Sequence, residues 1–148
     1  MPVLPLSDIA STTLVELLTY WQGLAPAGSV PNRQDVDPVH IPALLPAVSL
    51  VELIGPSRQP RFRLYGTEVV RGFGYDLTGK TLEEAGIGRE RSDYWLAVYR
   101  QVAETRQPVF GRDRGAVREF ITFEWVKLPL TTDGPAVDMI LCGYDFKL

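Results

Sequence analysis

The stretch RFRLYGTEVVRGFGYDLTGKTLEE, residues 61–84, carries three local patterns in succession. Its first residues alternate between charged and apolar side chains, which is the period of a half-buried strand. Residues 67–73 then place Val69, Val70 and Phe73 on one side of a helix. The glycine-rich residues that follow predict a turn, because glycine adopts backbone conformations closed to most other residues.

The sequence GYDLTGKT, which begins at Gly74 and ends at Thr81, also has the spacing of the phosphate-binding loop of nucleotide-hydrolysing enzymes. That loop joins a buried hydrophobic strand to the N-terminus of a long helix. Here Arg71 and Gly72 stand where the strand would end, and only a short helix, residues 81–85, is predicted to follow. A nucleotide-binding enzyme is therefore a remote alternative, and a glycine-rich turn is preferred.

The flanking sequence predicts helices and strands that indicate an α+β protein. Helices are predicted at residues 7–24, capped by Ser7 or Asp8, and at residues 92–106, capped by Ser92. Strands are predicted at residues 47–54, 61–66, 109–111, 117–130 and 136–146. Because strands lie on both sides of the central helices, we expect an antiparallel sheet with helices on one face.

The composition favours one soluble, cytoplasmic domain. The chain has 148 residues and a net charge of −3 without a run of like charges, so neither a nucleic acid nor a membrane is indicated as a partner. Cys142 is the single cysteine, which excludes an intrachain disulfide and favours a reducing compartment. The N-terminus has no secretion-signal pattern, and no apolar run approaches the roughly 20 residues that span a bilayer.

Two steps within the quoted stretch resemble the PAS domain family. One is FGY at residues 73–75, a hydrophobic–glycine–aromatic step at the end of a short helix, and the other is LTGK at residues 77–80. The long helix after them and the final strands, which end near Asp145, agree with that family. The resemblance implies a five-stranded antiparallel sheet with helices on one face.

A proline-rich segment, PNRQDVDPVHIPALLP at residues 31–46, is similar to the bacterial family of small single-domain PAS proteins found mostly in alphaproteobacteria. Members show Pro-x-Arg-x-Asp-x-Asp-Pro followed by Ile-Pro-x-Leu-Leu-Pro, and both motifs are present. The likeness extends over most of the chain from about Trp21. We accordingly divide the chain into residues 1–46, an N-terminal flanking helix with the Pro-rich segment, and residues 47–148, a PAS-like domain.

The resemblance implies a sensory or protein-interaction role and no reaction. We expect a non-enzymatic sensor in signal transduction that contacts another, unidentified signalling protein, because no kinase, cyclase or DNA-binding segment is seen. A small ligand is a further partner that could tune it. The alternative is a small-molecule receptor or carrier that uses a pocket between the long helix and the sheet.

No particular cofactor, metal or catalytic residue is indicated. Haem-binding PAS domains need an axial ligand, usually histidine, on the long helix, but His40 is the only histidine and lies in the Pro-rich segment. Photoreactive flavin domains need a cysteine before that helix, whereas Cys142 is on the last strand. Haem and photoreactive flavin are both disfavoured. A weak metal site at His40 with Asp35 and Asp37 is less favoured than a solvated loop.

Aromatic residues on the predicted helices and strands are the candidates for a ligand pocket. The candidate set is Tyr65, Phe73, Trp95, Tyr99, Phe110, Phe123, Trp125 and Met139. Tyr144 belongs to the same aromatic group. A filled core is the preferred alternative, because aromatic side chains at helix and strand spacing usually pack against one another.

Two surface features are further candidates for binding a partner or an anion. The N-terminal helix has an apolar stripe formed by Leu14, Leu17, Leu18 and Trp21. Burial of this stripe on the chain's own sheet and a homodimer contact are alternatives of equal weight. A basic cluster, Arg112, Arg114 and Arg118, lies at a predicted hairpin, where a solvated turn is favoured over a site for an anion or a partner.

Overall fold

The computed structural model describes residues 3–116 and 118–147. The strands are β1 (Val3–Leu4), β2 (Val48–Ile54), β3 (Gln59–Tyr65), β4 (Val109–Arg114), β5 (Thr122–Thr131) and β6 (Val137–Lys147). The α-helices are α1 (Thr12–Gln22), α2 (Thr67–Phe73) and α3 (Arg89–Thr105). Short 3₁₀ turns lie at Leu6–Asp8, Arg33–Asp35, Pro38–His40, Leu45–Ala47 and Glu83–Ala85.

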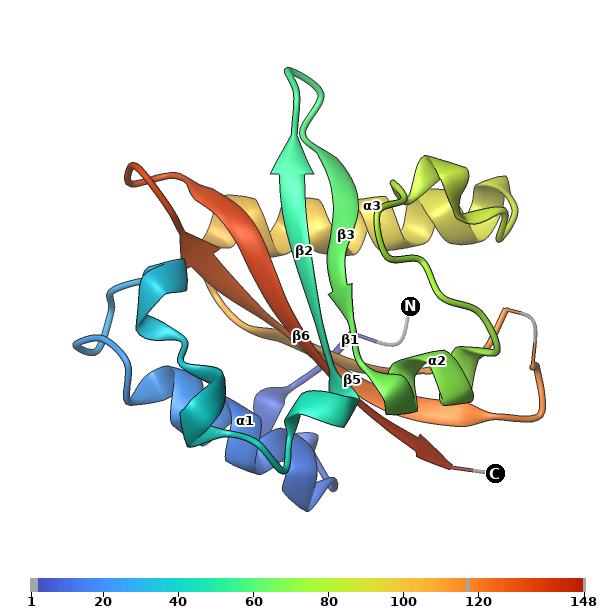
Figure 1. The fold of residues 1–148 in the computed structure, drawn as a ribbon, viewed down its shortest axis with the longest axis horizontal. Coiled ribbons are helices and arrows are strands. Elements are labelled where there is room, and N and C mark those ends of the chain that lie inside the picture. The colour runs from blue at the N-terminus through green and yellow to red at the C-terminus, as the bar shows by residue number, and fades with distance from the viewer. Residues whose placement is uncertain (1–2, 117, 148) are drawn as a thin grey trace.

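The strands form one antiparallel sheet in the order β1-β4-β5-β6-β2-β3 (Figure 1). This is the expected α+β architecture of PAS type. The sheet has six strands rather than five, because Val3 and Leu4 pair with Gly111 and Phe110 of β4. A pairing of only two residues leaves no period-2 pattern that sequence reasoning could detect.

Side-chain alternation along the strands divides the core into two layers. On β5, Phe123 and Trp125 pack in the cluster beneath α2 and α3, whereas Val126 and Leu128 pack with α1 and the Pro-rich segment. Successive side chains of a strand point to opposite faces, so one strand supplies both layers. The helices α1 and α3 thus cover opposite faces of the sheet.

Helix α1 begins at Thr12, so the prediction of a start at Ser7 or Asp8 is wrong. Ser11 is the N-cap, and its Oγ accepts a hydrogen bond from the Leu14 amide at 3.2 Å. Glu124 of β5 accepts a hydrogen bond from the Ser11 amide at 2.9 Å. A local cap and a carboxylate that is distant in sequence therefore meet at the start of the helix, and Leu6–Asp8 before it form a separate 3₁₀ turn.

Two further predicted boundaries differ from the structure. Helix α3 begins at Arg89 after Gly88, whose φ of 88° lies in the region that favours glycine, so Ser92 lies within the helix rather than at its cap. Strand β5 begins at Thr122 rather than at Val117, which lies outside the described residues. The amide of Ile121 donates to the Arg118 carbonyl at 3.0 Å, which closes a turn just before β5.

The glycine-rich stretch forms the edge of β3 rather than a phosphate cradle. It follows helix α2, which ends at Gly74 with a φ of 89°, and not a buried strand. The amide of Gly79 donates to the Phe62 carbonyl at 2.7 Å, and the amide of Phe62 donates to the Lys80 carbonyl at 2.9 Å. The backbone amide of Gly79 is thus already paired with the sheet.

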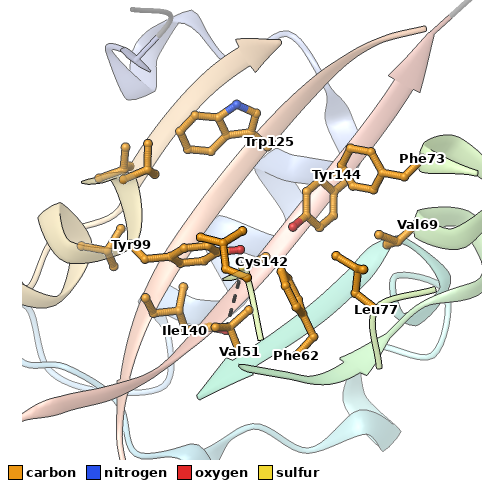
Figure 2. Packing of buried hydrophobic residues seen from close by; sticks show 14 of the residues in the cluster. Val51, Phe62, Val69, Phe73, Leu77, Tyr99, Trp125, Ile140, Cys142 and Tyr144 are labelled. Atoms are coloured by element: carbon orange, nitrogen blue, oxygen red, sulfur yellow. Dashed lines mark hydrogen bonds between the residues drawn. The ribbon is translucent and has the colours of Figure 1, made fainter. Parts of the chain in front are cut away.

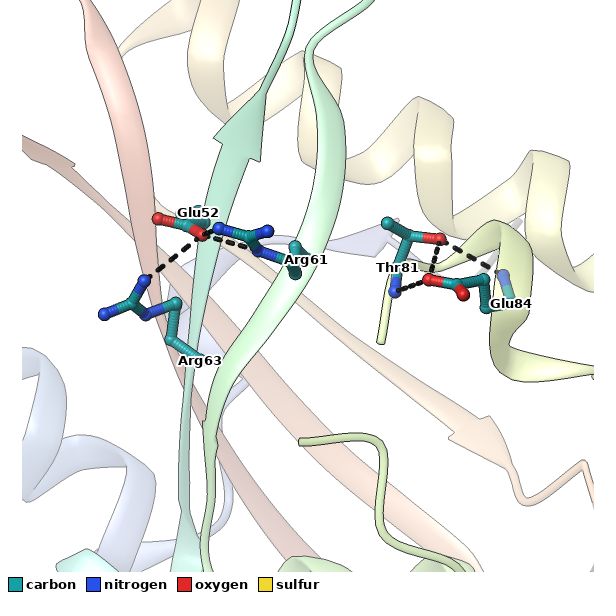
Figure 3. Close-up of polar contacts among 5 residues, drawn as sticks. All are labelled: Glu52, Arg61, Arg63, Thr81 and Glu84. Carbon is teal, nitrogen blue, oxygen red and sulfur yellow. Dashed lines mark hydrogen bonds and ion pairs between the residues drawn. The ribbon is translucent and has the colours of Figure 1, made fainter. Parts of the chain in front are cut away.

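Side-chain contacts hold the same region (Figure 3). Thr81 donates to Glu84 Oε1 from both its amide and its hydroxyl, each at 3.0 Å, which links the residues before the three-residue turn Glu83–Ala85 to the turn itself. Across β2 and β3, Arg61 Nε donates to Glu52 Oε1 at 2.6 Å. The charged residues Glu52, Arg61 and Glu84 therefore make structural contacts at this edge of the sheet.

Candidate ligand cavity beneath helix α3

A small cavity of about 40 Å³ lies between α3 and the sheet. It is lined by Phe62, Tyr65, Phe73, Tyr75, Leu77, Leu82, Ile87, Arg91, Trp95, Tyr99, Arg114, Ala116, Phe123, Lys127 and Tyr144. A water molecule needs about 10–15 Å³ measured in this way, so the space accommodates roughly three waters.

Helix and strand periods bring the lining residues together. Arg91, Trp95 and Tyr99 are spaced four apart on α3, so they share the face turned to the sheet. Phe123 and Lys127 of β5 lie four positions apart, an even spacing, and therefore point to that same face. The cavity is therefore built on regular elements, which hold its walls in place.

Lys127 is the unusual residue of this site, because its side chain is only 1% exposed. Its Nζ donates to the hydroxyls of Tyr99 at 3.2 Å and Tyr144 at 3.4 Å, and lies 3.6 Å from Cys142 Sγ. Within residues 3–116 and 118–147, no carboxylate forms an ion pair with it. Figure 2 shows the hydroxyl groups of Tyr99 and Tyr144 turned towards the region of Cys142.

Four aromatic rings surround the Lys127 ammonium group. Its Nζ lies 4.5 Å from the centroid of Tyr99, 5.0 Å from Trp95, 5.2 Å from Tyr144 and 5.4 Å from Trp125. Ring faces attract a cation at these distances. Burial nevertheless lowers the pKa of Lys127, and the nearby Cys142 and Asp113 oppose that shift.

The phenol groups around the cavity remain protonated at neutral pH. Burial raises the pKa values of Tyr65, Tyr99 and Tyr144 well above the ordinary range and raises the pKa of Tyr75 to about 12. A protonated phenol both accepts and donates a hydrogen bond. The cavity therefore offers several neutral hydroxyl donors beside the lysine.

Five of the eight predicted pocket residues line the cavity: Tyr65, Phe73, Trp95, Tyr99 and Phe123. Trp125 lies in the same cluster and contacts Trp95, with ring centroids 5.3 Å apart. Phe110 and Met139 lie in the cluster on the opposite face, so they do not line it. Strand alternation is the reason: Phe110 pairs with Val126 and Met139 with Leu130, and both partners face α1.

Lys127, Arg91 and Tyr75 also line the cavity, although the sequence did not indicate them as pocket residues. A signal for Lys127 was present, because the alternation that groups Phe123 with Trp125 continues to position 127. Of the basic cluster, Arg114 lines the cavity, whereas Arg112 pairs with Glu124 at 2.6 Å. Arg118 donates to the Arg71 carbonyl at 2.7 Å.

The apolar stripe of α1 packs on the chain's own sheet. Leu14, Leu17 and Trp21 are buried there, and Leu18 is half-buried beside them. Trp21 Nε1 also donates to the Pro129 carbonyl of β5 at 2.9 Å. Of the two alternatives, the structure therefore shows the intramolecular one for these side chains.

His40 lies on the surface, with its Nε2 4.0 Å from Asp37 Oδ2. Over residues 3–116 and 118–147, the structure contains no group of three or more His, Cys, Asp or Glu side chains suited to a metal ion. Nor does any helix in this described part have the length and apolarity needed to cross a bilayer.

A family model described as a PAS domain matches residues 9–144, nearly the whole chain. The chain belongs to the PAS domain family. Its six-stranded antiparallel sheet and the cavity under the long helix are therefore the sheet and interior of a PAS domain. Membership of this family supports a sensory or regulatory role.

One solved structure that is similar to this chain is described as "Structure of an RNA-binding Light-Oxygen-Voltage Receptor". The two sequences are 14% identical with a TM-score of 0.47, and the match covers 82% of this chain and 37% of that chain. This chain thus spans well under half the length of that receptor. At this level of similarity, neither RNA binding nor light sensing is transferred to it. No curated protein sequence matches the chain.

Proposed function

We propose that this PAS protein is a non-enzymatic sensory or regulatory module that acts through contact with another signalling protein and is tuned by a small ligand. The observation that carries the proposal is the cavity beneath α3, with a buried lysine in its wall. A buried cation without an ion-paired carboxylate is costly to the fold. A ligand that interacts with Lys127 in the cavity would offset this cost.

We further propose that the two predicted parts of the chain have separate tasks. Every residue that lines the cavity lies between Phe62 and Tyr144, within the predicted PAS-like domain of residues 47–148. Residues of the first part, such as Leu14, Leu17 and Val36, pack on the opposite face. In this proposal the second part senses, and the first part covers the sheet.

Native mass spectrometry of freshly purified protein tests the ligand part of this proposal. We expect a small additional mass that is lost on denaturation, and we expect the released compound to be chemically unchanged after prolonged incubation with fresh protein. A bare protein mass, together with NMR spectra that no small molecule perturbs near α3, would contradict the ligand. Turnover that persists through rigorous purification would contradict a non-enzymatic role.

A receptor or carrier whose function is the pocket itself is the second candidate. The cavity favours it only for very small cargo, because about 40 Å³ accommodates roughly three waters. The same small volume favours a ligand much smaller than haem or the photoreactive flavin that the sequence disfavours. The two functions differ in a test for partners: a carrier exchanges its cargo without any change in its affinity for another protein.

A further inference from the structure

We propose that the cavity beneath α3 binds a small oxyanion, such as a carboxylate of three or four non-hydrogen atoms. The inference deepens the proposed function, and rests on it in taking the cavity as the ligand site. Three properties of the lining carry it: its charge, its hydrogen-bond donors and its size.

The lining is cationic, and no aspartate or glutamate contributes to it. Its cations are Lys127, Arg91 and Arg114. In the described part of the chain neither Lys127 nor Arg114 takes part in an ion pair. Arg91 has only a long pair, at 3.7 Å, with the exposed Glu119. An anion in the cavity would supply the negative charge that the protein itself does not place there.

Asp113 is a carboxylate close enough to influence Lys127, but its hydrogen bonds are already made. Its Oδ2 accepts from the Tyr94 hydroxyl at 2.9 Å and from Trp125 Nε1 at 2.7 Å. It does not line the cavity. The charge of Asp113 therefore does not satisfy the groups that face the empty space.

The hydroxyl groups of the lining suit an acceptor. Tyr65, Tyr75, Tyr99 and Tyr144 are all neutral phenols at physiological pH, as their raised pKa values indicate. The oxygens of Tyr99 and Tyr144 accept hydrogen bonds from Lys127, and that of Tyr144 also accepts from Ser49 Oγ at 3.2 Å. The hydroxyls of Tyr65 and Tyr75 are therefore the donors left for a ligand. A ligand that accepts from phenols and pairs with ammonium and guanidinium groups is an oxyanion.

Size limits the class further. A space of about 40 Å³ accommodates roughly three waters, and hence formate, acetate, nitrite or nitrate rather than a nucleotide or a sugar phosphate. The apolar part of the lining, Phe73, Trp95 and Phe123, would suit a small apolar group such as the methyl of acetate.

The test is an amide NMR titration of the full chain with sodium formate, acetate, nitrite and nitrate, at an ionic strength held constant with sodium chloride. Acetamide is the matched control ligand, because it has the shape of acetate without the charge. We expect at least one of these anions to shift resonances of residues around the cavity in a saturable way, and acetamide to have no comparable effect.

Two variants locate the site. Lys127→Met removes the buried charge at nearly constant length, and we expect it to weaken anion binding at least tenfold. Lys80→Met removes a lysine from the exposed glycine-rich stretch, and should leave the affinity unchanged. Arg114→Gln, at an exposed position of the lining, gives an independent measurement that does not disturb the core, and should weaken binding severalfold.

The proposal is overturned if none of the four anions binds, if acetamide binds as well as acetate, or if Lys127→Met and Arg114→Gln both keep full affinity. An uncharged compound released in native mass spectrometry and seated in this cavity would also overturn it. That last result would leave the proposed sensory function standing, so the failures of the two proposals are distinguishable.

Discussion

Strand alternation places Lys127 beneath α3, where burial lowers the pKa of its ammonium group. The pKa of Lys127 in the folded state lies below its value in the unfolded chain. At pH values between the two, the unfolded chain therefore binds more protons than the folded one. Stability therefore rises as pH increases from the folded pKa towards about 10.4, where an unfolded lysine loses its proton. At pH values below the folded pKa, burial of the ammonium group is a cost to the unliganded fold.

Lys127→Met should consequently stabilise the unliganded protein at neutral pH, by about 1–4 kcal/mol, the range found when buried ionic groups are replaced by packed apolar ones. The advantage over the parent protein should shrink as the pH approaches about 10.4. Urea unfolding across this pH range in anion-poor buffer measures it, with Lys80→Met as the surface control. A difference independent of pH would mean that Lys127 is not held at a lowered pKa.

Gly66, the residue before α2, has a steric rather than a conformational requirement. A Cβ at this position would lie 2.4 Å from the Pro46 carbonyl oxygen and 2.6 Å from that of Leu45, both backbone atoms. We expect Gly66→Ala to cost about 1–3 kcal/mol or more, because the backbone must shift. Thermal unfolding measures this loss. Gly134→Ala, where a Cβ meets nothing within 4 Å, is the control and should change little.

At the scale of elements, β5 connects the two layers, because its residues alternate between them. Glu124, only 6% exposed, points to the α1 side between Trp125 and Phe123, which face the α3 side. Its carboxylate accepts hydrogen bonds from the Ser11 amide and from Arg112 Nε at 2.6 Å. The start of α1 is therefore attached to the strand that carries Lys127.

Glu124→Ala should destabilise the protein by about 1–3 kcal/mol, because the buried Ser11 amide loses its hydrogen-bond acceptor, whereas the loss of the pair with Arg112, whose side chain is 45% exposed, adds little. It should also increase amide exchange in the first turn of α1, near Ser11. Glu124→Gln keeps an oxygen acceptor for the Ser11 amide and should therefore lose less stability. Hydrogen exchange measured residue by residue separates the two effects. Equal exchange in both variants and the parent would contradict attachment of α1 through this carboxylate.

The sequence predicted elements well where the signal is local and poorly where a distant contact decides. The helix at 67–73 was predicted with its observed bounds, because its apolar periodicity and the glycine that ends it are adjacent. The start of α1 was missed because Ser7, Asp8 and Ser11 are all suitable caps, and the contact of Ser11 with Glu124, which is specific to the last of them, joins residues far apart in the chain. The cavity was half predicted: aromatic residues suggested it, but Lys127 was overlooked because lysine is expected at the surface.

At the scale of the whole molecule, the sheet is covered on both faces by the chain's own helices. The cluster beneath α1 includes Leu14 and Leu17, which are 0% and 1% exposed. Gly143 of β6 makes this approach close, since a Cβ there would lie 2.6 Å from Leu17 Cδ2. The fold thus buries the N-terminal stripe without a second copy of the chain.

Leu17→Ala distinguishes this intramolecular packing from the alternative of a homodimer contact. If Leu17 belongs to the chain's own core, the substitution should cost about 2–5 kcal/mol, as for other buried leucines. The unfolding midpoints of parent and variant should then not depend on protein concentration over a roughly hundredfold range. Val15→Ala, on the exposed side of α1, is the control and should cost well under 1 kcal/mol. A parent midpoint that rises with concentration, and loses this dependence in Leu17→Ala, would instead identify the stripe as a dimer interface.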